Sequence, residues 1–497
     1  MLTIETGSGA RTCDGGSRRD FLRIGTLALG GLTLPGLFAA RAAQAAANIS
    51  PSFVRDRAIV LLYLSGGASH IETFDPKMSA PDGVRSVTGE VQTSVPGVTF
   101  GGTFPLLAQQ AHRMAVVRSF QHAVTGHVEA HVHVLSGGTD PVGRQQTGFS
   151  MGSAYVRLRG GNHPATGMPT YSLLTETEVD GQYRNEAGRI AAGSWPGSLG
   201  LSYGPFRHEV GWQGDTNSGA TPVLADTKQQ RKSRVESTDG SAAANMRLNL
   251  SREVLDDRVE LLRRIDGLNR RMDGIRSMQA IDEFSQQALN VVLGGAFQAF
   301  DYRRESPKLL ERYDTSHIQI GHKVFRPSTL GRQMLVARRL CEAGCGFVTV
   351  HSAGWDMHAD GNNPGIVTGM EMLGRSLDKS VSAFLEDVAE RGLSEKILLI
   401  ITGDFGRTPM MNKKGGRDHW SKLSTLAFAG GGLRMGQAIG RSSSSLDVPA
   451  SEPISTPELM ATVMHSLFDI SQLRLAAGVP REISQRVDSG QPIAELF

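Results

Sequence analysis

Short, uninterrupted apolar segments followed by glycine or polar residues are the feature that most constrains the fold of this chain. Residues 58–65 read AIVLLYLS and are followed by Gly66-Gly67, and residues 397–402 read ILLIIT. Runs this short and this apolar predict strands that are buried on both faces of a parallel sheet. Weaker segments of the same kind lie at 114–118, 347–350 and 425–429.

Helical patterns separate these segments. Residues 331–343 precede the strand at 347–350, and residues 369–391 precede the strand at 397–402. The second pattern has its apolar residues at helical spacing, and Gly392 stands where a C-cap is expected. Strands that alternate with helices predict an α/β fold in which right-handed crossovers cover a mostly parallel sheet.

The middle of the chain has a different composition. Residues 139–245 are rich in Gly, Ser, Thr and Asn and predict extended loops and insertions over one edge of the sheet. Residues 251–300 are charged and predict a helical hairpin. We therefore expect one domain over residues 46–497, with 139–300 as a loop-rich insertion or cap region.

The N-terminal residues 1–45 have the pattern of a twin-arginine signal peptide. Arg18-Arg19 precedes Phe21-Leu22, a glycine-rich apolar stretch covers residues 24–40, and Ala43-Gln44-Ala45 supplies a cleavage site. A membrane anchor is the alternative, but the apolar stretch is short and diluted by glycine. We expect export by the twin-arginine machinery, removal of residues 1–45, and a periplasmic or secreted protein whose mature chain has no transmembrane segment.

The overall charge and the cysteines exclude two classes of function. The chain has 52 Lys and Arg against 49 Asp and Glu, a formal charge of +3, which argues against nonspecific nucleic-acid binding. An exported redox protein would need ligands for a haem or cluster, but the chain has three cysteines and no Cys-x-x-Cys-His motif.

Acidic and imidazole side chains follow several of the predicted strands. They include Asp356 and His358 after residues 347–350, Asp404 and Arg407 after 397–402, and His419 before 425–429. Open α/β sheets bind ligands at the carboxyl ends of their strands, so these groups are expected to converge on a metal. The alternative for each of them is a hydrogen-bonded structural role.

A second histidine group consists of His122, His127, His131 and His133. His127 and His131 would share one face of a helix, but Glu129 is in the wrong register for a His-Glu-x-x-His motif. There is no Gly-x-Ser-x-Gly elbow and no P-loop. For this group, metal binding and a structural or substrate-lining role remain equal alternatives.

Four motifs resemble the signatures of the exported bacterial family called "domain of unknown function 1501". They are GGASHIETFDPK (66–77), GWDMHAD (354–360), GDFGRTP (403–409) and GRDHW (416–420). The resemblance covers residues 57–473, and the family is similar to the alkaline phosphatase and sulfatase superfamily. It implies an alkaline-phosphatase-like α/β/α sandwich with one or two metals at the carboxyl ends of the strands.

The resemblance implies a metal site made of Asp356, His358, Asp404 and His419. It also departs from the superfamily: Phe405 replaces a histidine, the aspartate expected after the first strand is missing, and the nucleophile position falls on His127. His70 or Asp75 could take the place of the missing aspartate.

Two functions follow from this resemblance. The first is a hydrolase of phosphate or sulfate esters that uses Zn, Mn, Mg or Ca. In this hydrolase His127 or His70 would act as nucleophile or base, and Arg407 or Arg417 would bind a small anionic or polysaccharide substrate. The second is a non-catalytic relative that binds a ligand or partner in the same cleft.

Overall fold

The computed structural model describes residues 51–145, 148–176, 180–210, 220–221 and 296–497. The twin-arginine signal (1–45) lies outside the described residues, and so does nearly all of the helical hairpin expected at 251–300. None of the described helices is long and apolar enough to cross a membrane.

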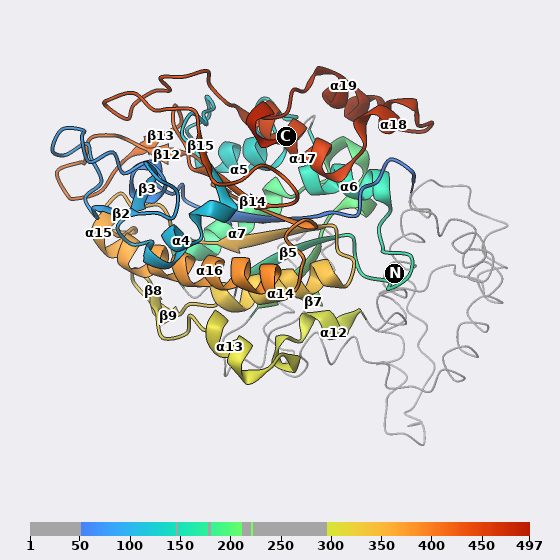
Figure 1. Ribbon diagram of the computed structural model, residues 1–497, viewed down its shortest axis with the longest axis horizontal. Helices are drawn as coiled ribbons and strands as arrows, with labels where there is room; N and C mark the ends of the chain where they lie inside the picture. Colours follow the sequence, from blue (N-terminus) through green and yellow to red (C-terminus); the bar gives the residue numbers. More distant parts are fainter. Residues whose placement is uncertain (1–50, 146–147, 177–179, 211–219, 222–295) are drawn as a thin grey trace, which may run out of the picture.

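A nine-stranded, mostly parallel sheet is the centre of the fold (Figure 1). In spatial order its strands are β15 (Gln437–Ile439), β4 (Met114–Val117), β14 (Leu426–Gly430), β11 (Ile397–Gly403), β1 (Ala58–Leu64), β10 (Phe347–Ser352), β5 (Tyr171–Glu176), β6 (Phe206–Val210) and β7 (Ala220–Thr221). The strands from β11 to β6 are parallel, whereas β14 runs antiparallel to both of its neighbours. The five strands predicted from apolar segments are all present.

Helices cover both faces of the sheet, which confirms the predicted α/β/α sandwich (Figure 1). On one face lie α4 (Pro105–Gln109), α12 (Phe297–Phe300), α13 (Pro307–Tyr313), α14 (Leu330–Glu342) and α16 (Arg375–Glu390), the last continuing α15 (Ile366–Gly369) and a π-helical turn (Met370–Gly374). On the other lie α5 (His127–Leu135), α6 (Met151–Arg159), α7 (Gly181–Gly193), α17 (Thr456–Leu467), α18 (Ile470–Leu475) and α19 (Arg481–Ser489).

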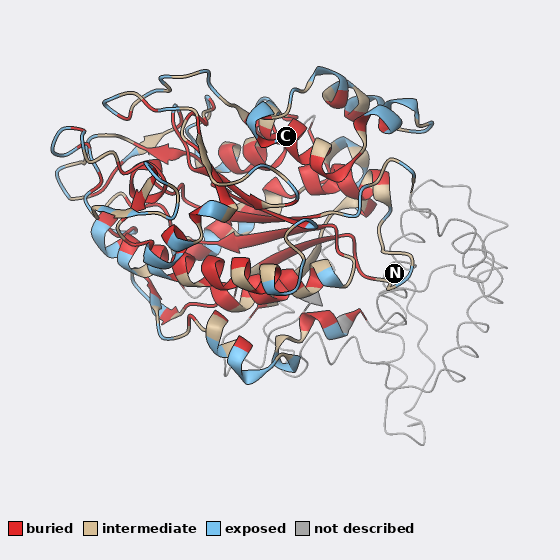
Figure 2. Ribbon diagram, in the orientation of Figure 1, coloured by how far each residue is buried: buried red, intermediate tan, exposed pale blue. Residues whose placement is uncertain are grey.

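Each face of the sheet has its own apolar core. Alternate residues of β1 belong to different cores: Val60 and Leu62 pack toward α14 and α16, and Ile59 and Leu61 pack toward α6 and α17. All seven residues of β1 are buried, as the uninterrupted apolar run predicts (Figure 2).

The expectation of loops over residues 139–210 is wrong, because β5, β6, α6 and α7 lie there and β5 is an interior strand. The small residues that suggested loops are used for close packing. A Cβ on Gly152 of α6 would lie 2.4 Å from the Tyr171 ring of β5, so only glycine fits there. Ser172 of β5 is fully buried between neighbouring strands.

Among the described residues, three short antiparallel strand pairs lie outside the main sheet: β2 (Glu90–Gln92) with β3 (Thr99–Gly101), β8 (Gln319–Gly321) with β9 (Phe325–Pro327), and β12 (Gly406–Arg407) with β13 (His419–Trp420). The pairing of β12 with β13 brings the loop after β11 next to the segment before β14. It therefore places two of the predicted motifs side by side at the carboxyl end of the sheet.

Candidate functional site

The candidate site lies where the parallel strands β1, β10 and β11 end. Gly66 and Gly67 follow β1, Asp356 and His358 lie in the loop after β10, and Asp404 follows β11. Because neighbouring parallel strands end at one edge, loops that are far apart in sequence meet there.

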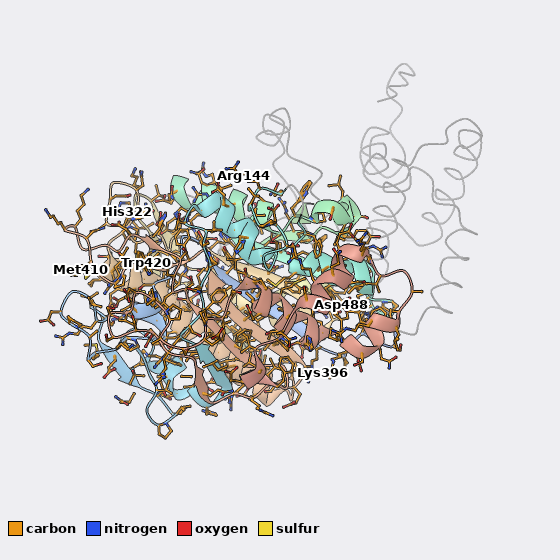
Figure 3. The ribbon with its side chains drawn as sticks, turned by 90° about the horizontal axis from the view of Figure 1, so that it is seen from above. Arg144, His322, Lys396, Met410, Trp420 and Asp488 are labelled. Carbon is orange, nitrogen blue, oxygen red and sulfur yellow. The ribbon has the colours of Figure 1, made fainter. Side chains whose placement is uncertain are left out.

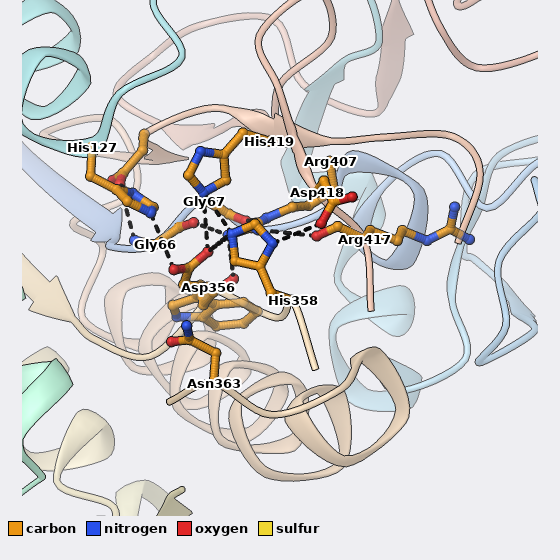
Figure 4. A network of polar contacts seen from close by, with 12 residues as sticks. Gly66, Gly67, His127, Asp356, His358, Asn363, Arg407, Arg417, Asp418 and His419 are labelled. Carbon is orange, nitrogen blue, oxygen red and sulfur yellow. Dashed lines mark hydrogen bonds and ion pairs between the residues drawn. The ribbon is translucent and has the colours of Figure 1, made fainter. Parts of the chain in front are cut away.

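Four side chains from three segments converge at this edge. A ligand atom from each of His127, Asp356, His358 and His419 lies within 4.8 Å of the others. Nε2 of His358 is 2.8 Å from Nε2 of His419 and 3.0 Å from Oδ1 of Asp356, and Nε2 of His419 is 3.3 Å from the same oxygen. Figure 4 shows the three imidazoles around the Asp356 carboxylate.

In His358 and His419, the hydrogen bond made by Nδ1 fixes the tautomer of the ring. Nδ1 of His358 donates to Oδ1 of Asp418 at 2.9 Å, and Nδ1 of His419 donates to the carbonyl oxygen of Thr125 at 3.0 Å. In the neutral rings both Nε2 atoms therefore carry lone pairs, which point at each other and at the Asp356 carboxylate.

These three acceptor atoms repel one another unless a proton or a cation lies between them. Imidazole nitrogens whose far N–H is held by a carboxylate or carbonyl, together with a carboxylate oxygen, form a common donor set for a divalent metal. Zinc bonds of about 2.0–2.1 Å place tetrahedral ligands roughly 3.3 Å apart. The observed separations are close to this value, so Asp356, His358 and His419 fit a metal.

Arg407 of β12 holds the Asp356 carboxylate in place. Its guanidinium is fully buried and its Nη2 donates to Oδ1 of Asp356 at 2.6 Å. The remaining donors bond to carbonyl oxygens, with Nε reaching Gly67 at 2.8 Å and Nη2 also reaching Gly66 and Trp355. Burial opposes ionisation of Asp356, but Arg407 and the three histidines outweigh it and hold the pKa of this carboxyl well below its usual range.

The glycines after β1 permit this arrangement. Gly66 and Gly67 have φ of +102° and +88°, a region that favours glycine. A Cβ on Gly66 would lie 2.3 Å from the Asp356 backbone nitrogen. The motif Gly66-Gly67 therefore lets the β1 loop approach the Asp356 loop and expose its carbonyls to Arg407.

His127 is the first residue of α5 and bridges two carboxylates. Its Nδ1 is 2.6 Å from Oδ2 of Asp404, and its Nε2 is 3.2 Å from Oδ2 of Asp356. Burial lowers the pKa of His127, but the two carboxylates outweigh burial and raise it above the ordinary value. His127 can therefore hold a proton next to the donor atoms, or turn Nε2 to them as a fourth ligand.

Asp404, predicted as a metal ligand, contacts the cluster through His127. It is fully buried, accepts from the backbone nitrogen of Gly66 at 3.2 Å, and its Oδ1 has no hydrogen-bond partner. His131, one turn after His127, lies 3.5 Å from that oxygen. Asp404 as a direct ligand stays a prediction.

His131, a member of the second histidine group, forms a buried pair with Ser65 below the site, and the sequence did not predict this pairing. Nδ1 of His131 donates to the carbonyl oxygen of His127 at 2.7 Å, so its Nε2 accepts from the Ser65 hydroxyl at 2.9 Å. The only available signal was the His127/His131 spacing on one helix face, which α5 confirms.

His70 lies apart from the donor atoms. Its Nε2 donates to the carbonyl oxygen of Leu446 at 3.1 Å, and burial lowers the pKa of His70 to about 4. His351 is buried within β10, neither of its ring nitrogens has a hydrogen-bond partner among the described residues, and burial lowers its pKa to about 3. The contact with Leu446 supports a structural role for His70, and a chemical role for His70 stays a prediction.

No curated protein sequence matches this chain. Solved structures that match include the lipoteichoic acid synthase LtaP from Listeria monocytogenes, with 9% identity and a TM-score of 0.35 over 83% of this chain and 72% of that chain. The PsFucS1 sulfatase from Pseudoalteromonas sp. has 13% identity and a TM-score of 0.34 over 90% and 72%. Alkaline phosphatase from the Antarctic bacterium TAB5 has 10% identity and a TM-score of 0.30 over 78% and 95%.

At these identities and TM-scores the likeness carries no argument about chemistry. The family comparison is stronger, because one family model matches residues 56–497. This range includes almost all of the residues that the structure describes. All four sequence motifs lie inside this match. The chain therefore belongs to the family described as "Protein of unknown function (DUF1501)".

Proposed function

We propose that this protein is a metal-dependent hydrolase of phosphate or sulfate esters. The observation that carries the proposal is the convergence of Nε2 of His358, Nε2 of His419 and Oδ1 of Asp356, whose separations are 2.8 to 3.3 Å. A divalent cation bound there would polarise an ester oxygen and make a water nucleophilic near neutral pH.

The chain's own residues would orient this chemistry and move its protons. Arg407 fixes Asp356, and Asp418 fixes the ring of His358. His127 lies at the edge of the same cluster with Asp404 behind it, so its Nε2 could take a proton from an attacking water while Asp404 stabilises the imidazolium. A ring backed by a carboxylate in this way is a common form of general base.

Ligand binding without turnover is the second candidate. The observation that favours it is the identity of the first residue of α5, which is the imidazole of His127 and not a hydroxyl or thiol side chain. The two candidates share the donor atoms and differ in whether a bound ester is broken.

Metal analysis of the purified protein and a panel of nitrophenyl phosphate and sulfate esters separate the two. The hydrolase proposal predicts a bound divalent metal and turnover that both fall in Asp356→Ala and His358→Ala. Protein that binds metal and anions but leaves every ester intact supports the second candidate. Metal-free protein that is inert to all esters removes the first.

We also propose that the protein acts outside the cytoplasm. The support is the twin-arginine pattern at Arg18-Arg19 and the cleavage-like Ala43-Gln44-Ala45.

A further inference from the structure

An open hollow of about 310 Å³ lies beside the donor atoms. It is lined by His358, Asp360, Asn412, Lys413, Lys414 and Asp418. His358 belongs both to this wall and to the donor cluster, so the hollow adjoins the donor atoms at its ring.

The two lysines sit in a turn that is tied to the backbone of His358. The amide nitrogen of Asn412 donates to the carbonyl oxygen of His358 at 2.9 Å, and its amide oxygen accepts from the backbone nitrogens of Lys414 and Gly416 at 3.0 Å each. A Cβ on Gly416 would lie 2.1 Å from the carbonyl group of His358, so the turn packs directly on that residue. The backbone from which the lysines project is therefore held at a fixed place relative to the donor atoms.

The carboxylates in the hollow are already engaged. Oδ1 of Asp360 accepts from the backbone nitrogens of Asn362 and Asn363 at 2.7 and 2.9 Å. Oδ1 of Asp418 accepts from Nδ1 of His358 at 2.9 Å. Both groups are thus occupied in holding loops and rings.

Lys413 and Lys414 place positive charge beside these carboxylates, which keep their own negative charge. Both lysines are exposed, and neither ammonium has an ion pair with any residue in the described part of the chain. Figure 3 shows Met410 and Trp420, which flank this turn in sequence, at one end of the molecule, and Lys396 and Asp488 at the other. The turn that carries the two lysines therefore lies at the same end as the candidate site.

We infer that Lys413 and Lys414 bind a second anionic group on the substrate, so that the preferred substrate is an ester whose alcohol part carries a further sulfate, phosphate or carboxylate. The inference rests on the proposed function for the reacting group at Asp356, His358 and His419. It adds the class of the rest of the substrate: a polyanion instead of a singly charged ester. Exposed ammonium groups distinguish ligands mainly by charge, because their flexible side chains place little constraint on the shape of the ligand.

The test uses two probes that cannot be hydrolysed, phenylphosphonate and 4-carboxyphenylphosphonate, titrated calorimetrically into the Zn²⁺-loaded full chain. We expect the carboxylated probe to bind about threefold to tenfold more tightly at low salt, because each exposed ion pair adds a modest increment. In Lys413→Gln/Lys414→Gln this preference should fall to about one, with the affinity for phenylphosphonate little changed. Lys308→Gln/Lys379→Gln removes the same charge from α13 and α16 and should keep the preference.

Equal preference in the wild type and in the Lys413→Gln/Lys414→Gln variant would overturn the inference, and so would a protein that binds neither probe. The proposed function is decided separately by ester turnover. A protein that hydrolyses no ester but shows the lysine-dependent preference refutes the hydrolase and supports this anion site.

Discussion

Replacing Arg407 by methionine tests how the donor atoms are held. The change removes the charge that faces Asp356, whose side chain is only 5% exposed, and it also takes donors away from the carbonyls of Gly66, Gly67, Trp355 and Arg417. Removing one partner of a buried ion pair costs about 3–5 kcal/mol, because the remaining charge is left without compensation. Domains are stable by only about 5–15 kcal/mol, so this loss is a large fraction of the total.

The assay is equilibrium unfolding by urea in the presence of a chelator, which keeps a cation from replacing the lost charge. Arg407→Lys is the graded variant: it keeps the charge but has three donors on a point-like ammonium, and we expect a smaller loss. Arg474→Met is the control, because its ion pair with Asp488 is 51% and 61% exposed and should contribute at most about 1 kcal/mol. An Arg407→Met variant that loses no more stability than this control would refute the reasoning.

Three further predictions concern metal, pH and export. Zn²⁺ added to chelator-treated protein at a hundredfold excess over Kd should raise the free energy of unfolding by about 2.7 kcal/mol, and His358→Ala/His419→Ala should abolish the gain in a thermal-shift measurement. Burial lowers the pKa of His208 to about 4, so the unfolded chain binds an extra proton at this residue between that pH and about 6.5. His208 should therefore contribute roughly 3 kcal/mol to the loss of stability on acidification through this window, and His208→Leu should make the fall of the urea midpoint with pH less steep, the remainder coming from buried histidines such as His70 and His351. Arg18→Lys/Arg19→Lys should keep the precursor in the cytoplasm in a cell-fractionation assay, whereas N-terminal sequencing of exported wild-type protein should find cleavage near Ala45.

The strands were predictable wherever burial on both faces imposes a simple composition. Residues 58–64 and 397–403 are fully buried, and only apolar side chains satisfy that environment without hydrogen bonds. β5 was missed because its buried positions are not filled by an uninterrupted run of apolar side chains. Ser172 is buried there, and Tyr171 packs on Gly152. A strand that accommodates its neighbours through small residues has the same composition as a loop.

The sequence predicts which segments form the site, but it does not predict the contacts between their side chains. The rule that ligands lie at the carboxyl ends of parallel strands pointed to Asp356, His358 and His419, which the structure brings together. The resemblance assigned the nucleophile position to His127, and its helical spacing with His131 offered metal binding as one of two equal alternatives. Its contact with Asp404 depends on how α5 packs on the sheet, and no local pattern in the sequence encodes that.

The orientation of each donor also depends on a group from another segment, which explains why the site cannot be read from one motif. Asp356 is held by Arg407, the ring of His358 by Asp418, and the ring of His419 by the carbonyl of Thr125. Each of these contacts fixes an atom that would otherwise rotate, and together they force three acceptor atoms into mutual contact. Two neutral imidazole acceptors and a carboxylate oxygen cannot donate to one another, so hydrogen bonds satisfy this arrangement only when one ring carries an extra proton. Their convergence is therefore best explained by a positive species that binds between them. The Zn²⁺ titration determines whether this species is a proton or a metal ion.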